Sequence, residues 1–357
     1  MSTAREAAAT AKLQELLDPV TGLSWSVSKQ VRRVAEVGGR LQVDIELGYP
    51  SLSLHESIRR QLGQALDAEV TVTQKIVAHA VQRGLSPLPG VKNLIAVASG
   101  KGGVGKSTTA ANLALALQAE GARVGLLDAD IYGPSVPTLM GVKGKPESRD
   151  GRSMEPLLAH GLQLMSIGFL VGEDQAMIWR GPMATGALEQ LLRQTNWQDL
   201  DYLVVDLPPG TGDIQLTLAQ RVPVTGALIV TTPQDLALVD AKKAVAMFQK
   251  VGVPILGLVE NMAVYCCPNC GHAEAIFGAD GGKAMAAQLG LSYLGALPLE
   301  RAIREHADSG MPTVVAAPDS GATGLYKALA RQSAVAVARL AKDYAAKFPT
   351  ITVSKST

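Results

Sequence analysis

The stretch Gly100-Lys101-Gly102-Gly103-Val104-Gly105-Lys106-Ser107 decides the fold of this 357-residue chain, because it fits the phosphate-loop pattern G-x-x-x-x-G-K-S/T. An apolar, strand-like run at residues 94–98 precedes it, and a helical run at residues 108–118 follows directly. Glycines in such a loop allow successive backbone N–H groups to surround phosphate oxygens, and the helix N-terminus adds the positive end of its dipole. We therefore expect a nucleotide site in which the residues from Gly100 to Thr108 contact the nucleotide.

Three side chains of this loop carry its chemistry. Lys106 is expected to neutralise the β- and γ-phosphates of ATP, and Ser107 to hold a Mg²⁺ ion. Lys101 is a second lysine that an ordinary phosphate cradle does not use. If it has no function in the site, it is simply a solvent-exposed side chain. The sequence G-K-G-G-V-G-K-S resembles the deviant Walker A motif of the MinD-like ATPases, in which this lysine reaches the nucleotide of a partner subunit. That resemblance implies a homodimer in which each chain contributes Lys101 across the interface.

Beyond the loop, the second part of the chain alternates apolar, strand-like runs with helical stretches. The runs lie at residues 94–98, 123–127, 202–205, 227–230, 255–259 and 293–296. Continuous apolar strands separated by helices are typical of a parallel sheet that is buried on both faces. We therefore predict an α/β P-loop NTPase domain at residues 93–357, with a mostly parallel sheet covered by helices on both faces.

The first part of the chain has a different pattern and predicts a small α+β domain at residues 1–84. Helices are expected at residues 11–17 and 52–66, and strands at residues 41–47 and 69–77, where apolar and polar residues alternate. Two prolines and two glycines fall within the eight residues 83–90, which indicates a linker. We place this linker at residues 85–92.

Composition and charge exclude several classes of protein. Hydrophobic residues make up 47% of the chain and charged residues 18%, as in a protein with a large buried core and not in a disordered one. The formal net charge is +1 and no apolar run is long enough to span a bilayer, so neither nucleic acid nor a membrane is expected as a partner. Three cysteines cannot form a disulfide framework and the chain starts without a signal peptide, so a reduced, cytoplasmic protein is expected.

Polar residues stand where several strands end, at the sheet edge where such folds bind ligands. We expect Asp130 to orient the attacking water, Asp128 to support the metal shell and Asp206 to stand on the Mg²⁺ side of the site. A helix N-cap or a turn is the alternative for each aspartate. Gly210 is expected to donate its backbone N–H to the γ-phosphate, within a nucleotide-sensing switch at residues 208–213. Asn261 resembles the base-reading asparagine of related ATPases, with an ordinary turn as its alternative.

The cysteines at positions 267 and 270 form a C-x-x-C motif. Cys267 and Cys270 supply two thiolates, which is half of what a tetrahedral zinc ion or an iron–sulfur cluster requires. Nothing else in the chain completes the set, but a two-fold dimer would bring two such pairs together. Pro268 and Gly271 favour a turn, whereas a thioredoxin-like redox pair is expected at a helix N-terminus. The spacing itself leaves iron–sulfur and zinc both open.

Several motifs, in the same order along the chain, resemble those of the Mrp/ApbC family of iron–sulfur cluster carriers. They cover about residues 91–322 and lie at residues 128–135, 206–213, 259–262, 267–271 and 276–278. The resemblance implies a dimer that binds a [4Fe–4S] cluster between its subunits through Cys267 and Cys270 and passes it to apo-proteins. It also implies slow ATP hydrolysis, for which we take Lys101, Lys106 and Asp130 as the catalytic residues, and it leaves Cys266 outside the ligand pair.

The N-terminal domain resembles the small MIP18-like domain that is often fused ahead of this ATPase. Such domains commonly carry a cysteine in the loop after the second strand. Here the loop reads Gly48-Tyr49-Pro50-Ser51-Leu52-Ser53-Leu54, and no cysteine precedes Cys266. We therefore expect the domain to serve docking or dimer organisation.

Two other functions are compatible with the phosphate loop. One is a MinD-like positioning or partition switch, a class that needs a basic surface or a basic amphipathic helix at its C-terminus. Residues 329–348 are instead alanine-rich with scattered Lys and Arg, like a helix packed on the sheet. The other is a zinc-bridged dimeric ATPase. Metal analysis separates the zinc protein from a cluster carrier, and pelleting with liposomes and ATP separates the switch from it.

Overall fold

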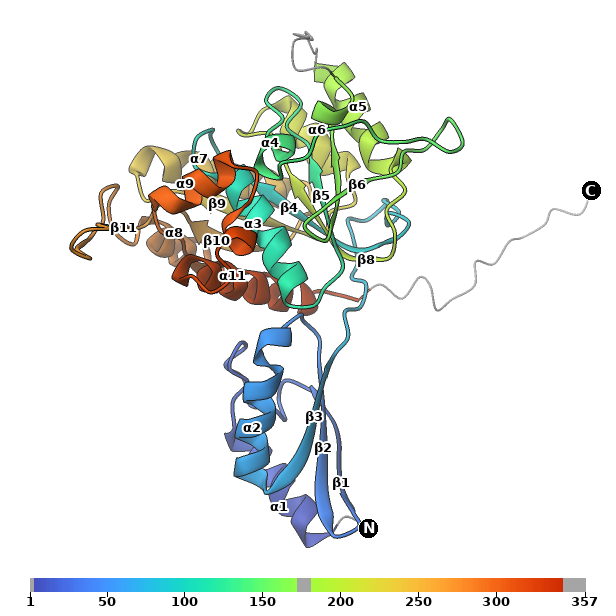
Figure 1. The fold of residues 1–357 in the computed structure, drawn as a ribbon, viewed down its shortest axis with the longest axis vertical. Helices are drawn as coiled ribbons and strands as arrows, with labels where there is room; N and C mark the ends of the chain where they lie inside the picture. The colour runs from blue at the N-terminus through green and yellow to red at the C-terminus, as the bar shows by residue number, and fades with distance from the viewer. Residues whose placement is uncertain (1–2, 172–180, 343–357) are drawn as a thin grey trace, which may run out of the picture.

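The computed structural model describes residues 3–171 and 181–342, which form a small N-terminal unit attached to a larger α/β unit (Figure 1). In these residues the larger unit contains an eight-stranded sheet with the order β13-β10-β9-β4-β8-β5-β7-β6. The strands are β4 (Val91–Ala98), β5 (Val124–Asp128), β6 (Leu157–Ala159), β7 (Leu162–Ser166), β8 (Leu200–Asp206), β9 (Gly226–Thr231), β10 (Ile255–Glu260) and β13 (Tyr293–Ala296). Every pairing is parallel except that of β6 with β7, so the predicted mostly parallel sheet is confirmed.

Helices cover both faces of this sheet because side chains of successive strand residues point to opposite sides. In β4, Ile95 and Val97 join one core cluster, and Leu94, Ala96 and Ala98 join the other. The helices on the first face are α3 (Lys106–Ala119), α4 (Val136–Leu139), α10 (Thr313–Ala316) and α11 (Gly321–Ala338), with α9 (Arg301–Asp308) against α4 and α10. Those on the second face are α5 (Gly181–Gln194), α6 (Asp213–Arg221), α7 (Asp235–Lys250) and α8 (Gly281–Leu289).

The N-terminal unit has a three-stranded sheet of its own. Its elements are α1 (Ala4–Glu15), β1 (Val31–Val37), β2 (Arg40–Leu47), the 3-10 turn η1 (Leu52–Leu54), α2 (His55–Leu66) and β3 (Ala68–Gln74). The strand β2 pairs antiparallel with β1 and parallel with β3. The predicted bounds of the first helix are wrong, because a capping box between Thr3 and Glu6 starts this helix well before residue 11. The strand β1 was not predicted.

The terminal helix was expected to pack on the sheet, and α11 does so as far as Ala338, while residues 343–348 of that prediction lie outside the described residues. The eight-stranded sheet already begins at Val91, within the predicted linker. The domain boundaries at 84 and 93 stay a prediction. None of the described helices is both long and apolar enough to span a membrane.

A buried glutamate joins the two units. Glu120 follows directly on α3 and is fully buried, and its Oε1 lies 2.6 Å from Nη1 of Arg331 in α11. The hydroxyl of Ser53 donates to the same carboxylate at 2.6 Å, and the backbone N–H of Leu52 donates to the Glu120 carbonyl at 3.1 Å. The residue at the end of the phosphate-loop helix therefore also holds the N-terminal unit in place.

Candidate functional site

The phosphate loop lies between β4 and α3, as the sequence predicts. Gly103 and Gly105 both adopt a φ of +80°, a left-handed conformation that favours glycine. A Cβ atom at Gly105 would also collide with the carboxamide of Asn261, and one at Gly100 with the backbone of Asp240. The loop glycines are therefore needed both for backbone conformation and for close packing.

A pocket above the loop brings together eight of the predicted site residues. These are Lys101, Gly102, Gly103, Gly105, Lys106, Ser107, Thr108 and Asp130. Pro209, which belongs to the predicted switch at residues 208–213, also lines the pocket, and three residues that sequence reasoning missed complete the lining, namely Ser99, Ser135 and Leu139. Of these, Ser135 ends the motif at residues 128–135, so its position in that motif was an available signal. Gly100, Val104, Asp128, Asp206, Gly210 and Asn261 lie outside this lining.

Lys106 makes a buried ion pair with Asp206. The Lys106 Nζ atom lies 2.5 Å from Oδ1 of Asp206, and both side chains are almost completely buried. Nζ also donates to the Ser107 hydroxyl at 3.3 Å. The second carboxylate oxygen of Asp206, Oδ2, is buried and has no hydrogen-bond partner in the described part of the chain. Asp206 does not line the pocket, but its partner Lys106 does. The orphaned Oδ2 fits a site for a cation, since a buried carboxylate oxygen without a partner is costly.

Asp128 is fully buried, and its carboxylate binds backbone N–H groups of the loop that carries Asp130. Its carboxylate accepts from the backbone N–H groups of Asp130 at 3.1 Å, Ser135 at 2.9 Å and Val136 at 3.0 Å, and from the hydroxyl of Ser166 at 3.1 Å. Burial and, next, the nearby charge of Asp206 raise the pKa of Asp128. Asp128 therefore positions the segment 130–136, and this contact set was not predicted.

Asp130 stands at the edge of the pocket and is half-buried. Burial raises the pKa of Asp130, and the Lys106 ammonium opposes that shift. A carboxylate with a raised pKa is suited to accept a proton from water. Its role in orienting water stays a prediction.

Asn261 contacts the phosphate loop, and Gly210 contacts the residue just before it. The Gly210 N–H donates to the Ser99 carbonyl at 3.0 Å, and the Asn261 amide donates to the Val104 carbonyl at 2.8 Å. The Gly210 N–H thus needs to leave Ser99 before it can bind a γ-phosphate. The predicted contacts of both residues with nucleotide stay predictions, and their contacts here tie the segments after β8 and β10 to the loop.

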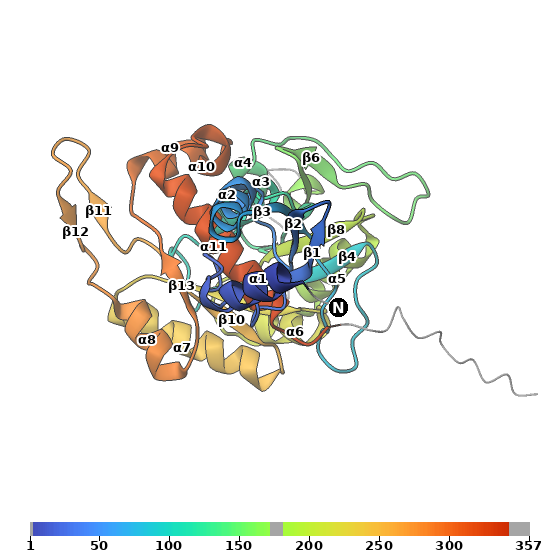
Figure 2. The same cartoon turned by 90° about the horizontal axis from the view of Figure 1, so that it is seen from below.

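The C-x-x-C motif lies at the tip of a small hairpin formed by β11 (Tyr265–Cys266) and β12 (Ala273–Glu274). In both views this hairpin projects from the body of the larger unit (Figures 1 and 2). The Cys267 N–H donates to the His272 carbonyl, and the Gly271 N–H donates to the Cys267 carbonyl, both at 2.9 Å. The motif therefore adopts a tight turn, as expected, and not the start of a helix.

Both thiols of this turn are accessible, and the pKa of Cys267 is lowered. Cys270 is exposed and Cys267 is partly exposed. Hydrogen bonds to the Cys267 sulfur lower the pKa of Cys267. They come from the backbone N–H of Asn269, then from the backbone N–H of Cys270 and from the Cys270 thiol. A lowered pKa increases the thiolate fraction, and the thiolate is the form that binds metal. Within the described residues no cluster of three or more His, Cys, Asp or Glu side chains could hold a metal ion. One chain thus offers an incomplete ligand set at this tip.

Comparison with known proteins follows the same division of the chain. Residues 90–334 match the family described as NUBPL iron-transfer P-loop NTPase, and residues 6–74 match a family described as iron-sulfur cluster assembly protein. An iron-sulfur cluster carrier protein of Escherichia coli strain K12 is 52% identical over 311 residues, which are 85% of this chain and 84% of that protein. The iron-sulfur cluster transfer protein NUBPL of Mus musculus is 52% identical over 274 residues, 75% of this chain and 86% of that protein.

Among solved structures, a nucleotide-binding protein of Archaeoglobus fulgidus in complex with ADP is similar to the larger unit. Its TM-score is 0.56 and its identity 39%, over 62% of this chain and 87% of that chain. The eight-stranded sheet, the strand–loop–helix site and this similarity define the class of the protein, which is a P-loop NTPase. The chain belongs to the NUBPL iron-transfer P-loop NTPase family.

Proposed function

We propose that this protein is an ATP-dependent iron–sulfur cluster carrier, and the exposed C-x-x-C turn is the observation that carries this proposal. A thiol pair at the tip of a projecting hairpin can hold a cargo and release it to another protein without unfolding of the sheet. Family membership and the two curated relatives support the same function. The recipients are apo iron–sulfur proteins. Thiolate ligation requires reduced cysteines, so we place this activity in the cytoplasm.

The cargo is a [4Fe–4S] cluster held between two copies of the chain. Such a cluster takes four thiolates, and each chain supplies Cys267 and Cys270. A two-fold homodimer places two identical turns opposite each other and completes the set. Cys266 is exposed in β11 and precedes the turn, so we leave it out of the ligand set.

The phosphate-loop pocket binds and slowly hydrolyses ATP with Mg²⁺. Lys106 would exchange its Asp206 partner for the phosphates. Ser107 and Asp206, whose Oδ2 has no hydrogen-bond partner among the described residues, would hold a Mg²⁺ ion, which would neutralise phosphate charge. Asp130 orients the attacking water, and Lys101 reaches the nucleotide of the partner subunit. The Lys101 side chain lines the pocket and makes no ion pair among the described residues. The dimer has a state that holds the cluster and a state that releases it. Nucleotide binding shifts the dimer between these states only if the two states differ in their affinity for the nucleotide.

Anaerobic reconstitution with iron and sulfide tests this function. We expect about four irons and four sulfides per two chains, together with a dimeric mass in solution. Cys267→Ser and Cys270→Ser should each lose the cluster, because the substitution is present in both chains and leaves two of the four thiolates in the dimer. Cys266→Ser, one residue away, is the matched control and should keep it.

Stoichiometric zinc without sulfide would contradict the carrier and indicate a zinc-bridged dimer. Retention of the cluster in both Cys267→Ser and Cys270→Ser would place the ligands elsewhere.

A further inference from the structure

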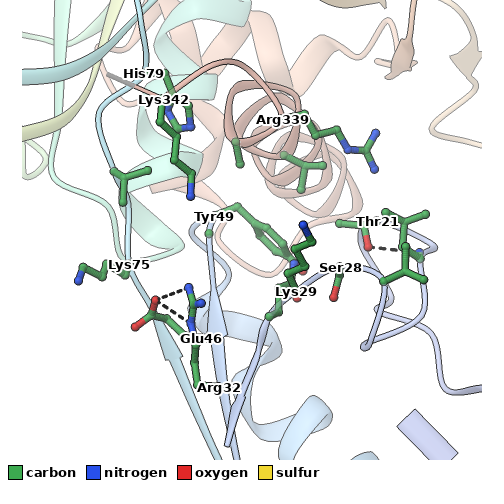
Figure 3. Close-up of a pocket in the computed structure, with 17 residues that line it drawn as sticks. Thr21, Ser28, Lys29, Arg32, Glu46, Tyr49, Lys75, His79, Arg339 and Lys342 are labelled. Carbon is green, nitrogen blue, oxygen red and sulfur yellow. Dashed lines mark hydrogen bonds and ion pairs between the residues drawn. The ribbon is translucent and has the colours of Figure 1, made fainter. Parts of the chain in front are cut away.

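A second cavity lies between the N-terminal unit and the end of α11 (Figure 3). It has a volume of about 380 Å³ and shares no lining residue with the nucleotide pocket. Its walls come from β1 and the loop before it, from β2 and the residues after it, from residues 75–79, and from the C-terminal end of α11 and the residues that follow. A cavity of this size is at the lower end of the range for small-molecule sites.

The charges that line this cavity are strongly unbalanced. Five cationic side chains lie in its walls, namely Lys29, Arg32, Lys75, Arg339 and Lys342, against Glu46 as the one carboxylate of the lining. Glu46 is already occupied, since its Oε1 accepts from Nη2 of Arg32 at 2.8 Å and from Nε at 3.2 Å. The other four cations make no ion pair with any described residue. The side chains that line the cavity therefore carry an excess of positive charge. The buried carboxylate of Asp18 lies behind the wall, where it accepts from the Tyr49 hydroxyl at 2.7 Å.

Two of the unpaired cations are directed into the cavity. In Figure 3 the ammonium ends of Lys29 and Lys342 extend toward the space beside Tyr49, whereas Lys75 and Arg339 extend away at its sides. Lys29 belongs to the N-terminal unit and has a φ of +56°, a conformation that is uncommon for a residue other than glycine. Lys342 lies beyond α11, in a β-bridge with His79. The two ammonium groups thus come from the two units.

The rest of the wall adds no negative charge. His79 is buried, its Nδ1 lies 2.9 Å from Oδ1 of Asn93, and the amide of Asn93 donates to the Val77 carbonyl at 2.9 Å. Oδ1 is therefore the acceptor and Nδ1 the donor, so that Nε2 carries a lone pair, and Nε2 has no hydrogen-bond partner in the described part of the chain. Burial lowers the pKa of His79, which keeps the ring neutral. Apolar side chains of α11, such as Val335, complete the wall.

We propose that this cavity is a second ligand site, which binds a small organic polyanion, a phosphate ester or a polycarboxylate, between the ammonium groups of Lys29 and Lys342. Lysine binds phosphate and carboxylate oxygens as a compact point charge, without the planar geometry that arginine imposes. A ligand with at least two negative charges offsets the repulsion between the two lysines. Because it touches both units, the bound ligand stabilises their docked arrangement.

Calorimetric titration of the full chain tests the site with two probes, citrate as a polycarboxylate and 2,3-bisphosphoglycerate as a phosphate ester. Saturating Mg-ADP is present throughout, so that the phosphate loop is not available to the probes. We expect saturable binding of at least one probe, and an affinity lower by about a hundredfold in Lys29→Gln/Lys342→Gln, since each charge-assisted contact contributes about a tenfold factor. The matched control is Lys143→Gln/Lys145→Gln, two exposed lysines outside the cavity.

Binding of one probe alone identifies the ligand class, and binding of both supports the shared chemistry. Absence of saturable binding up to about 10 mM would overturn the proposal. Equal affinities of the cavity variant and the control would also overturn it. Thermal unfolding of both variants without probe shows whether each one folds, so that a loss of binding is not a loss of structure.

Discussion

Replacing Lys106 with alanine should remove the effect of ATP on cluster transfer and leave cluster binding intact. The Lys106 ammonium makes charge-assisted hydrogen bonds to the phosphates in the proposed mechanism, and their loss should weaken Mg-ATP binding by about tenfold to a hundredfold. The cysteine turn lies on a separate hairpin, so reconstitution of the variant should give the wild-type iron content. The measurement is the rate of transfer to an apo-protein, with and without ATP, for both proteins.

The structure adds a control to this experiment. Lys106→Ala leaves the buried carboxylate of Asp206 without its ion-pair partner, which costs about 3–5 kcal/mol of stability. The double variant Lys106→Ala/Asp206→Asn removes that unpaired charge and should regain part of the stability, measured by guanidinium unfolding, without regaining the response to ATP. If either variant transferred clusters as fast as wild type with ATP present, the proposed nucleotide switch would be wrong.

Replacing Glu120 with alanine should lower the free energy of unfolding by about 3–5 kcal/mol, because it removes one partner of a buried ion pair. The change leaves the guanidinium of Arg331 and the hydroxyl and N–H of Ser53 without their acceptor. Glu120→Gln retains an oxygen for Ser53 but loses the charge, and should fall between alanine and wild type. Guanidinium unfolding of the full chain, together with proteolysis at residues 85–92, measures the loss and shows whether the two units separate.

Glu56→Ala is the matched control for this prediction. Glu56 is a largely exposed glutamate paired with Arg59 in α2, and the loss of such a surface pair costs about 1 kcal/mol or less. A loss for Glu120→Ala no larger than that of Glu56→Ala would show that the carboxylate contributes little to holding the units together.

Much of the fold could be predicted from the sequence where strands are continuous apolar runs. The strands at residues 94–98 and 293–296 were predicted within three residues of their bounds because they are bounded by clear turn signals. The strand β6 was missed because Leu157–Ala159 is short and at the sheet edge, and β7, an inner strand of five residues, was missed as well. The strand β1 was missed because its sequence, VRRVAEV, places two arginines in succession and breaks the alternation expected for a half-buried strand.

In the candidate site, contacts between neighbouring residues could be predicted from the sequence, and contacts between distant segments could not. The phosphate loop could be predicted because its glycines, Lys106 and Ser107 are adjacent in the chain. The hydrogen bond of Ser166 to Asp128 and the ion pair of Lys106 with Asp206 join segments far apart in sequence, and only the folded sheet brings them together. The polyanion cavity is less predictable still, because its cations come from the first 75 residues and the last 20.

The hairpin that carries the cysteines is attached to the sheet through backbone hydrogen bonds, so another hairpin sequence can take its place. It is anchored by backbone hydrogen bonds beside β13, from the Leu299 N–H to the Val264 carbonyl at 2.8 Å and from the Ala263 N–H to the Leu297 carbonyl at 3.0 Å. Cys267 and Cys270 take no part in either core cluster. Residues 265–274 could therefore diversify during evolution, or be grafted onto a related nucleotide switch, at little cost to the host fold. Cargo preference and the nucleotide cycle are separable traits in such an architecture.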